Sequence, residues 1–158
     1  MESDRLNQWL SLGANFGVII GLALLIVELN QTNRISEYSA EIARRNQAMD
    51  INSSRIEHSE TYAKLQEGGL ELSPSEQVQA LMMARQLLNY WSNAETAYER
   101  GLLSDSSFDG VLNDISVSLK EAPGLIPYFA YLQDANRKED DDSIVADRIA
   151  EIVSRVEN

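Results

Sequence analysis

Three glycines, Gly13, Gly17 and Gly21, lie four residues apart within an uncharged apolar run from Trp9 to Val27. At about 1.5 Å of rise per residue, a helix over this run can cross a hydrocarbon core of about 30 Å. Residues spaced by four share one side of a helix, and small residues there let two membrane helices approach closely. The run therefore predicts a transmembrane helix with a packing face of glycines.

The apolar run favours membrane insertion and is expected to be retained in the protein. Each strongly apolar residue contributes roughly −0.3 to −0.6 kcal/mol to insertion, which outweighs one Asn and three Gly. The start of the chain contains Glu2, Asp4 and Arg5, whereas a cleaved signal peptide has a basic start and a shorter apolar region. We predict a polar tail over residues 1–8 and a span over 9–29, with Trp9 at the membrane interface.

Basic residues near the two ends of the span predict its orientation. Only Arg5 precedes the span, while Arg34, Arg44 and Arg45 follow it. Because an excess of Lys and Arg marks the cytoplasmic side, the N-terminus is expected outside and the C-terminal domain in the cytoplasm. The sequence thus predicts a single-pass protein of the cytoplasmic (inner) membrane, with the lipid bilayer as its first partner.

Charge and cysteine content exclude several classes of function. The chain has 158 residues, of which 25 are acidic and 13 basic, so its formal net charge is −12. This balance argues against nucleic-acid binding, which needs clustered Lys and Arg. With no cysteine, disulfides, thiolate catalysis and Cys-based zinc sites are excluded. The residues after the span suffice for one small domain.

The segment 30–67 is predicted to be a juxtamembrane helix. Neither Pro nor Gly occurs from Glu28 to Gln66, so the helix is expected to continue to the Gly68-Gly69 pair. One apolar residue recurs every seven positions, which predicts a second helix–helix interface, although the intermediate positions are mostly polar. The alternative is that this stripe packs on the domain that follows. The stripe consists of Ile35, Ile42, Met49 and Ile56.

Residues 73–158 are predicted to form a small helical bundle. Ser73, Pro74 and Glu76 form a capping box with Pro at the first helical position, and this helix is expected to end at Gly101. Its apolar residues at three- and four-residue steps are Val78, Leu81, Leu88, Trp91 and Tyr98.

Three further helices are expected in this domain, and no strand pattern is found, so the predicted fold class is all-α. Asp105 or Ser106 is expected to cap a helix that ends before Pro123-Gly124, and Pro127 suits the first turn of the next one. After a polar linker over Glu139–Asp142, Ser143 is expected to cap a final amphipathic helix. The expected apolar face of that helix is Val145, Ile149, Ile152 and Val156.

This layout resembles a group of short single-span bacterial membrane proteins of unknown function. The resemblance rests on the apolar sequence Ala-Asn-Phe-Gly-Val (14–18), the exit Val-Glu-Leu-Asn-Gln-Thr (27–32), the start Leu-Ser-Pro-Ser-Glu (72–76) and the end Tyr-Glu-Arg-Gly-Leu-Leu (98–103). It implies an N-terminal transmembrane helix followed by a helical soluble domain, and it implies no activity.

No catalytic or metal-binding constellation is predicted. His58 is the only histidine, and a lone histidine on a polar helix face is usually solvated. The sequence Asp105 to Gly110 lacks the alternating oxygen ligands and terminal Glu of a calcium loop. We therefore expect no enzyme activity, no cofactor and no small-molecule substrate.

The sequence favours a non-enzymatic, membrane-anchored interaction protein. It would be either a homo-oligomeric scaffold or an accessory subunit of a larger membrane complex, with Gly13, Gly17, Gly21 and Asn15 as helix–helix contacts. Ser11 and Asn15 lie roughly opposite the glycines, so an alternative is an oligomeric pore lined by these two residues. The expected partners are copies of the same chain or other membrane subunits.

Overall fold

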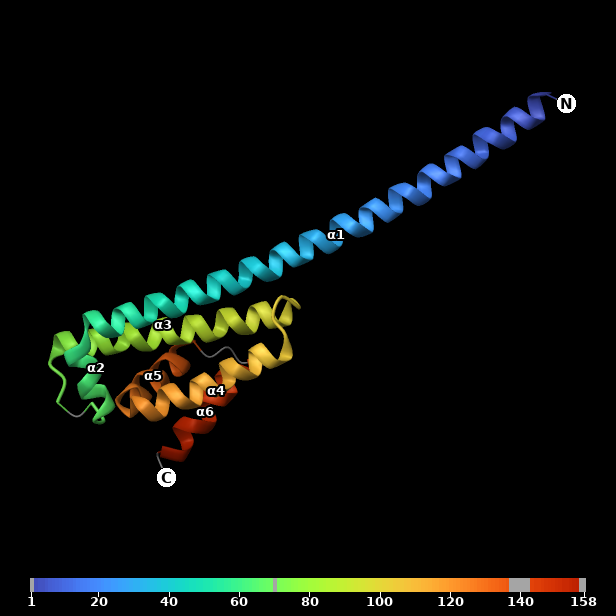
Figure 1. The fold of residues 1–158 in the computed structure, drawn as a ribbon. Helices are drawn as coiled ribbons and strands as arrows, with labels where there is room; N and C mark the ends of the chain where they lie inside the picture. Colours follow the sequence, from blue (N-terminus) through green and yellow to red (C-terminus); the bar gives the residue numbers. More distant parts are fainter. Residues whose placement is uncertain (1, 70, 137–142, 157–158) are drawn as a thin grey trace. The chain divides into compact units, whose positions relative to one another are not determined.

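The fold is all-α, as predicted (Figure 1). The computed structural model describes residues 2–69, 71–136 and 143–156. At residues 2–8, 11 and 156 this description covers the backbone and not the side chain. Within these ranges the regular elements are helical, and none is a strand. The elements are α1 (Glu2–Glu57), α2 (Ser59–Gln66), α3 (Pro74–Glu99), α4 (Asp105–Glu121), the 3₁₀ turn η1 (Pro123–Leu125), α5 (Ile126–Asn136) and α6 (Ile144–Val156).

The chain divides into two compact units, Met1–Ser39 and Ala40–Asn158. The first unit contains the N-terminal part of α1, and helical structure begins at Glu2, ahead of the predicted span. The second unit begins inside the segment predicted as the juxtamembrane helix. Its helical residues 40–57 therefore belong with the domain that follows.

The prediction of an uninterrupted helix to Gln66 is wrong at His58. This residue has φ −112° and ψ 40°, which lies outside the helical region, and α2 starts after it. No Pro or Gly marks this break in the helix. The His58 N–H still donates to the Ser54 carbonyl at 3.0 Å, so the last turn of α1 keeps its helical hydrogen bond. The break lets α2 turn Thr61 and Leu65 into the core, and Leu65 becomes fully inaccessible to solvent. Burial of these side chains overrides the local preference for a straight helix.

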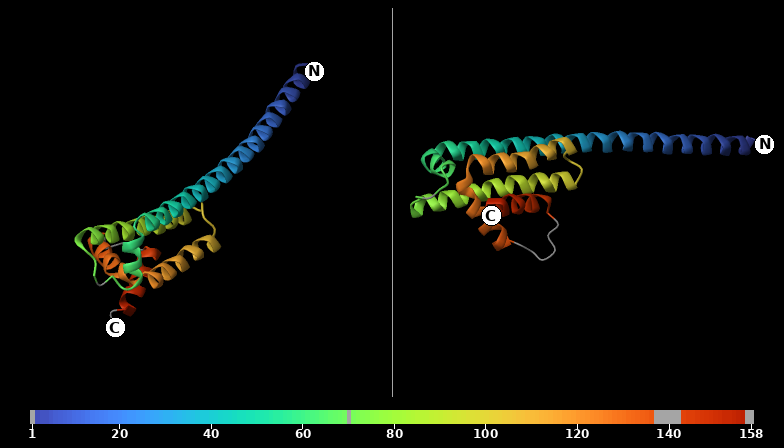
Figure 2. Two further views of the ribbon diagram at one scale, coloured as in Figure 1. Left: turned by 60° about the vertical axis from the view of Figure 1, so that its left-hand side comes forward. Right: turned by 90° about the horizontal axis from the view of Figure 1, so that it is seen from below.

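Helix α3 organises the second unit. It contacts α2, α4, α5 and α6, and two further views show these helices gathered along it (Figure 2). The indole of Trp91 stacks on Phe129 of α5 with ring centroids 5.3 Å apart. The largest fully buried side chains are Trp91, Phe129, Leu65, Ile115, Leu119, Leu125, Leu132, Ile149, Val111 and Val145.

The buried face of α3 differs from the predicted one at its start. Val78 is 62% exposed, so its assignment to the core is wrong. Trp91 is buried as expected, whereas Leu81, Leu88 and Tyr98 are partly buried. The buried face of α3 includes Ala80, Ala84 and Ala94, whose small side chains allow the neighbouring helices to pack closely on it. The buried residues of α3 are Ala80, Met83, Ala84, Leu87, Tyr90, Trp91, Ala94 and Glu95.

Both predicted ends of α3 are confirmed. The Ser73 N–H donates to Glu76 Oε2 at 2.7 Å, and the Glu76 N–H donates to Ser73 Oγ at 3.4 Å, which completes the capping box. At the other end, Gly101 has φ 69° and its N–H donates to the Tyr98 carbonyl at 2.8 Å. A left-handed residue here closes the helix, and glycine adopts that conformation without a steric penalty.

The prediction for the start of α4 is wrong by one or two residues. Ser104 is the N-cap, and its Oγ accepts from the Ser107 N–H at 3.4 Å. Three consecutive polar residues can each cap a helix, and their local sequence does not distinguish them. Helix α4 ends at Glu121, before Pro123, as predicted.

The last two helices follow the predicted layout. Pro127 lies in the first turn of α5, and Ser143 caps α6 because its Oγ accepts from the Ala146 N–H at 3.1 Å. Val145 and Ile149 are buried, and Ile152 is partly buried. The predicted linker Glu139–Asp142 and the side chain of Val156 lie outside the described residues.

Candidate functional site

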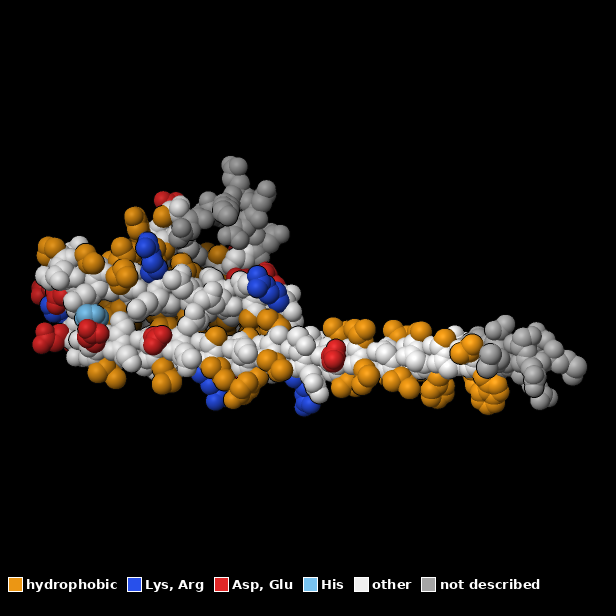
Figure 3. Space-filling view, turned by 90° about the horizontal axis from the view of Figure 1, so that it is seen from above, with side chains coloured by type: hydrophobic (Ala, Val, Ile, Leu, Met, Phe, Trp, Pro, Cys, Tyr) orange, Lys and Arg blue, Asp and Glu red, His pale blue; other side chains and the backbone are white. Residues whose placement is uncertain are grey.

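The apolar part of α1 is long and apolar enough to cross a membrane. None of its described side chains is buried by the protein, and Figure 3 shows apolar side chains projecting from the thin helical part of the chain. A solvent-exposed helix that is apolar on all sides is typical of a segment surrounded by lipid. The exposed large apolar residues are Trp9, Leu10, Leu12, Phe16, Val18, Ile19, Ile20, Leu22, Leu24, Leu25, Ile26, Val27 and Leu29.

The three predicted interface glycines lie on an open surface. A Cβ atom at Gly13, Gly17 or Gly21 would meet no heavy atom within 4 Å. At about 100° per residue they span about 80° of the helix circumference. Asn15 is exposed on the opposite side, so it does not share a face with the glycines. The Ser11 side chain, predicted with Asn15 to line a pore, is outside the described residues.

The part of the seven-residue stripe that lies in the second unit does not pack on its own domain, so that alternative is wrong for Ile42, Met49 and Ile56. Met49 is 64% exposed and Ile56 is 77% exposed, and Ile42 is exposed as well. The side chain that α1 buries is instead Ile51, which is 8% exposed. Ile51 lies roughly opposite the stripe on the helix.

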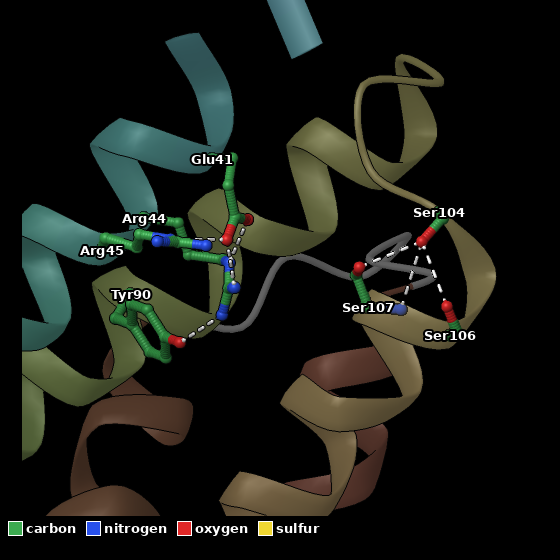
Figure 4. Close-up of polar contacts among 7 residues, drawn as sticks. All are labelled: Glu41, Arg44, Arg45, Tyr90, Ser104, Ser106 and Ser107. Carbon is green, nitrogen blue, oxygen red and sulfur yellow. Dashed lines mark hydrogen bonds and ion pairs between the residues drawn. The ribbon is translucent and has the colours of Figure 1, made fainter. Parts of the chain in front are cut away.

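A polar cluster reinforces the attachment of α1 to α3 on the side of Ile51 (Figure 4). Arg44 Nε and Nη2 donate to the Glu41 carboxylate at 3.0 and 2.9 Å, and Arg44 Nη1 donates to the Tyr90 hydroxyl at 3.2 Å. Arg45 Nε donates to Glu41 Oε1 at 2.9 Å. Hydrogen bonds from both arginines lower the pKa of Glu41, and the bond to Glu41 raises the pKa of Arg44.

A buried carboxylate that sequence reasoning missed holds α6 in place. Glu95 of α3 is 6% exposed. It accepts from Ser143 Oγ at 2.7 Å and from the Val145 N–H at 3.2 Å. A carboxylate at a helix N-terminus satisfies donors that have no partner within the helix. Its partners lie 48 and 50 residues away, so no local motif marks this contact.

A groove of about 460 Å³ lies between α4 and α6. It is lined by Asp109, Leu112, Asn113, Ile144, Asp147, Arg148 and Glu151. Two nitrogens of the Arg148 guanidinium are paired, because Nη1 donates to Glu151 at 2.6 Å and Nη2 to Ser116 Oγ at 3.0 Å, whereas its buried Nε has no hydrogen-bond partner among the described residues. The groove therefore offers chiefly carboxylates and two apolar side chains.

In the part of the chain that the structure describes, no three His, Asp or Glu side chains are placed to hold a metal ion. His58 is half-buried at the break between α1 and α2.

Comparisons with known protein families, with curated proteins and with solved structures found no match. Over the residues that the structure describes, the protein is all-α and carries one helix long and apolar enough to span a membrane.

Proposed function

We propose that this chain is a non-enzymatic interaction protein anchored in a membrane by the helix over residues 9–29. It associates with other membrane helices through Gly13, Gly17 and Gly21, as a homo-oligomeric scaffold or as an accessory subunit of a larger membrane complex. The observation that carries the proposal is that the large apolar side chains of this segment are all exposed and none is buried by the protein.

Energetics support a lipid environment for this segment. Leaving one large apolar side chain in water instead of an apolar environment costs about 1.5–3 kcal/mol. More than ten such side chains are exposed between Trp9 and Leu29. This cost is removed when the helix lies in a bilayer.

The glycine face supports association rather than anchoring alone. Helices in lipid have no hydrophobic drive toward each other, so close backbone approach and dispersion hold them together. Gly13, Gly17 and Gly21 provide an open surface for such an approach. We assign the C-terminal domain to the cytoplasmic side of a bacterial inner membrane, on the basis of the arginines that follow the span.

The anchoring is tested by extraction. A spanning helix resists carbonate and high salt and is released by detergent, whereas a charge-held surface protein is released by either wash. Recovery of the protein in the soluble fraction after a high-pH wash would refute the anchoring. A reporter fused after Asn158 is expected to be active on the cytoplasmic side, and an extracytoplasmic signal would reverse the orientation.

The association is tested by Gly17→Leu. The added side chain separates the backbones, so oligomers should weaken in native mass spectra of the detergent-solubilised protein, while insertion improves. Phe16→Leu is the matched control, because it changes volume off the glycine face. Spectra of Gly17→Leu that match the unmodified protein would show that the glycines are not the contact.

A further inference from the structure

The second unit holds residues 40–57 of α1 by few buried contacts. The structure describes every residue of this segment, and Ile51 is the one that is buried. Ala48 packs on the core beside it and is only partly buried. Helix α2 is shorter and yet buries both Thr61 and Leu65. Because burial of apolar surface is the main force that holds helices together, segment 40–57 is attached more weakly than α2.

The seam between this segment and α3 is loosely packed. An apolar slot of about 200 Å³ lies between the two helices. Atoms that line an unfilled space lose the dispersion contacts that a close neighbour would provide. The slot is lined by Ala40, Ala43, Arg44, Gln47, Asn93, Ala94, Ala97 and Leu103. The short side chains of its alanines leave the space open, so α1 and α3 adhere less than closely packed helices do.

Among the described residues, one side-chain hydrogen bond crosses this seam. Arg44 Nη1 donates to the Tyr90 hydroxyl at 3.2 Å, which is at the long end of the usual range, and Figure 4 shows the two side chains meeting. Arg44 Nε and Nη2 donate to Glu41 of the same helix. Separation of α1 from α3 therefore breaks the bond to Tyr90, while the guanidinium keeps its carboxylate partner.

A hinge lies at the end of the segment. His58 has φ −112° and ψ 40°, outside the helical region, and it separates α1 from α2. Hinges are commonly a few residues at the end of an element that absorb changes in φ and ψ. The guanidinium of Arg55 lies 5.1 Å from the centre of the Tyr62 ring, so the contact that spans the break lies next to the hinge.

Helix α2 is fixed to α3 beyond the hinge. Thr61 Oγ1 donates to Gln79 Oε1, and Lys64 Nζ forms an ion pair with Glu76 Oε1 at 2.6 Å. The side chain of Leu65 is fully buried. A rotation at His58 therefore moves α1 and leaves these contacts of α2 in place.

We propose that residues 40–57 of α1 form a hinged arm that swings away from α3 about His58 while α2 to α6 stay folded. Opening of the arm uncovers the face of α3 that carries Tyr90 and Ala94. A segment held by few buried apolar contacts opens with a smaller free energy than the whole domain. The inference concerns the second unit alone, so it goes beyond the proposed function and does not depend on the glycine association.

Cysteine labelling tests the arm, because the chain has no cysteine. Ala94→Cys places a thiol in the wall of the slot, at a residue that is 4% exposed, and Val111→Cys places one in the core of α4, at a residue that is 2% exposed. The full-length variants in detergent micelles are labelled with a polyethylene-glycol maleimide, which is too bulky to enter the slot. Each rate is divided by the rate for the same variant in denaturant.

The arm predicts that position 94 is labelled at least ten-fold faster than position 111. Local opening exposes the first thiol, whereas the second is exposed only when the domain unfolds. Equal relative rates would mean that α1 leaves α3 only on global unfolding, and would overturn the inference. Ala97→Cys repeats the test at a second position in the wall of the slot.

Tyr90→Phe distinguishes opening of the arm from other routes to the thiol. It removes the hydroxyl that accepts from Arg44, so labelling of Ala94→Cys should become several-fold faster while that of Val111→Cys keeps its rate. Tyr131→Phe is the matched control, because its side chain is exposed on α5, and it should leave both rates unchanged. No acceleration at position 94, or equal acceleration at both positions, would contradict the arm.

Discussion

Gly124 packs so closely on Gly69 that a Cβ atom at position 124 would lie 2.8 Å from the Gly69 backbone nitrogen. The same atom would lie 2.9 Å from the Leu65 carbonyl oxygen, so it meets backbone that cannot move aside as a side chain can. Here the end of α2 rests directly on η1, and the absence of a side chain at position 124 makes this possible.

Replacing Gly124 by Ala should destabilise the second unit by about 1–3 kcal/mol, because the new methyl group forces the two backbones apart. Thermal unfolding in detergent, followed by circular dichroism, measures the loss. Gly110→Ala is the control: its Cβ meets nothing within 4 Å in the interior of α4, so the substitution should stabilise by up to about 1 kcal/mol. Equal unfolding temperatures for Gly124→Ala and the unmodified protein would contradict the close contact.

The hydrogen bond from Trp91 Nε1 to Asp114 Oδ2, 2.8 Å long, joins the centre of α3 to α4. Asp114→Ala leaves the N–H of a fully buried indole without a partner, and we expect a loss of about 1–3 kcal/mol in denaturant unfolding. Trp91→Phe removes the donor, so Asp114→Ala should cost much less in that background. Additive losses in the double variant would show that the bond contributes nothing to stability.

Acid should weaken the start of α3 through Glu76. Hydrogen bonds from Lys64 and from Ser73 lower the pKa of Glu76 from its usual 4.5 to about 2. Because the folded-state pKa is depressed, the stabilisation is complete above about pH 4.5 and is lost as the pH falls toward about 2. Glu76→Gln should lack this part of the pH dependence in unfolding titrations between these values. Parallel pH profiles for the two proteins would rule out this contribution of Glu76.

Two apolar residues of α1 that lie two positions apart, Met49 and Ile51, should respond differently to truncation. Ile51→Ala removes a side chain that is 8% exposed, which should cost about 2–5 kcal/mol of folding stability. Met49→Ala removes one that is 64% exposed and should change stability by less than about 0.5 kcal/mol. Both are measured by thermal unfolding of the full chain, and the reverse order would mean that the faces of α1 are assigned wrongly.

Helix boundaries with local chemical signals were predictable from sequence. The capping box of Ser73 and Glu76 and the left-handed Gly101 act through residues within one turn of the helix end, so nearby residues suffice to recognise them. At the start of α4, Ser104, Asp105 and Ser106 carry equivalent signals, and the choice of Ser104 depends on more than residue type.

Features that depend on distant contacts were not predictable. The break at His58 has no Pro or Gly to mark it and arises from burial of Leu65 against the rest of the domain. Apolar periodicity suggested which residues of α1 could pack, but Ile51 is a single apolar residue among polar neighbours and gives no periodic signal. The glycine face is visible in sequence because its small residues repeat within a single helix.

The capping of α6 by Glu95 can form only late in the synthesis of the chain. Its partner Ser143 follows 48 residues later. At about 5–20 residues per second, a ribosome needs roughly 2–10 s to add that stretch. Throughout this interval the Glu95 carboxylate, which is buried in the finished fold, lacks both of the α6 donors that satisfy it there, so this part of α3 reaches its native environment only after Ser143 and Val145 have been made.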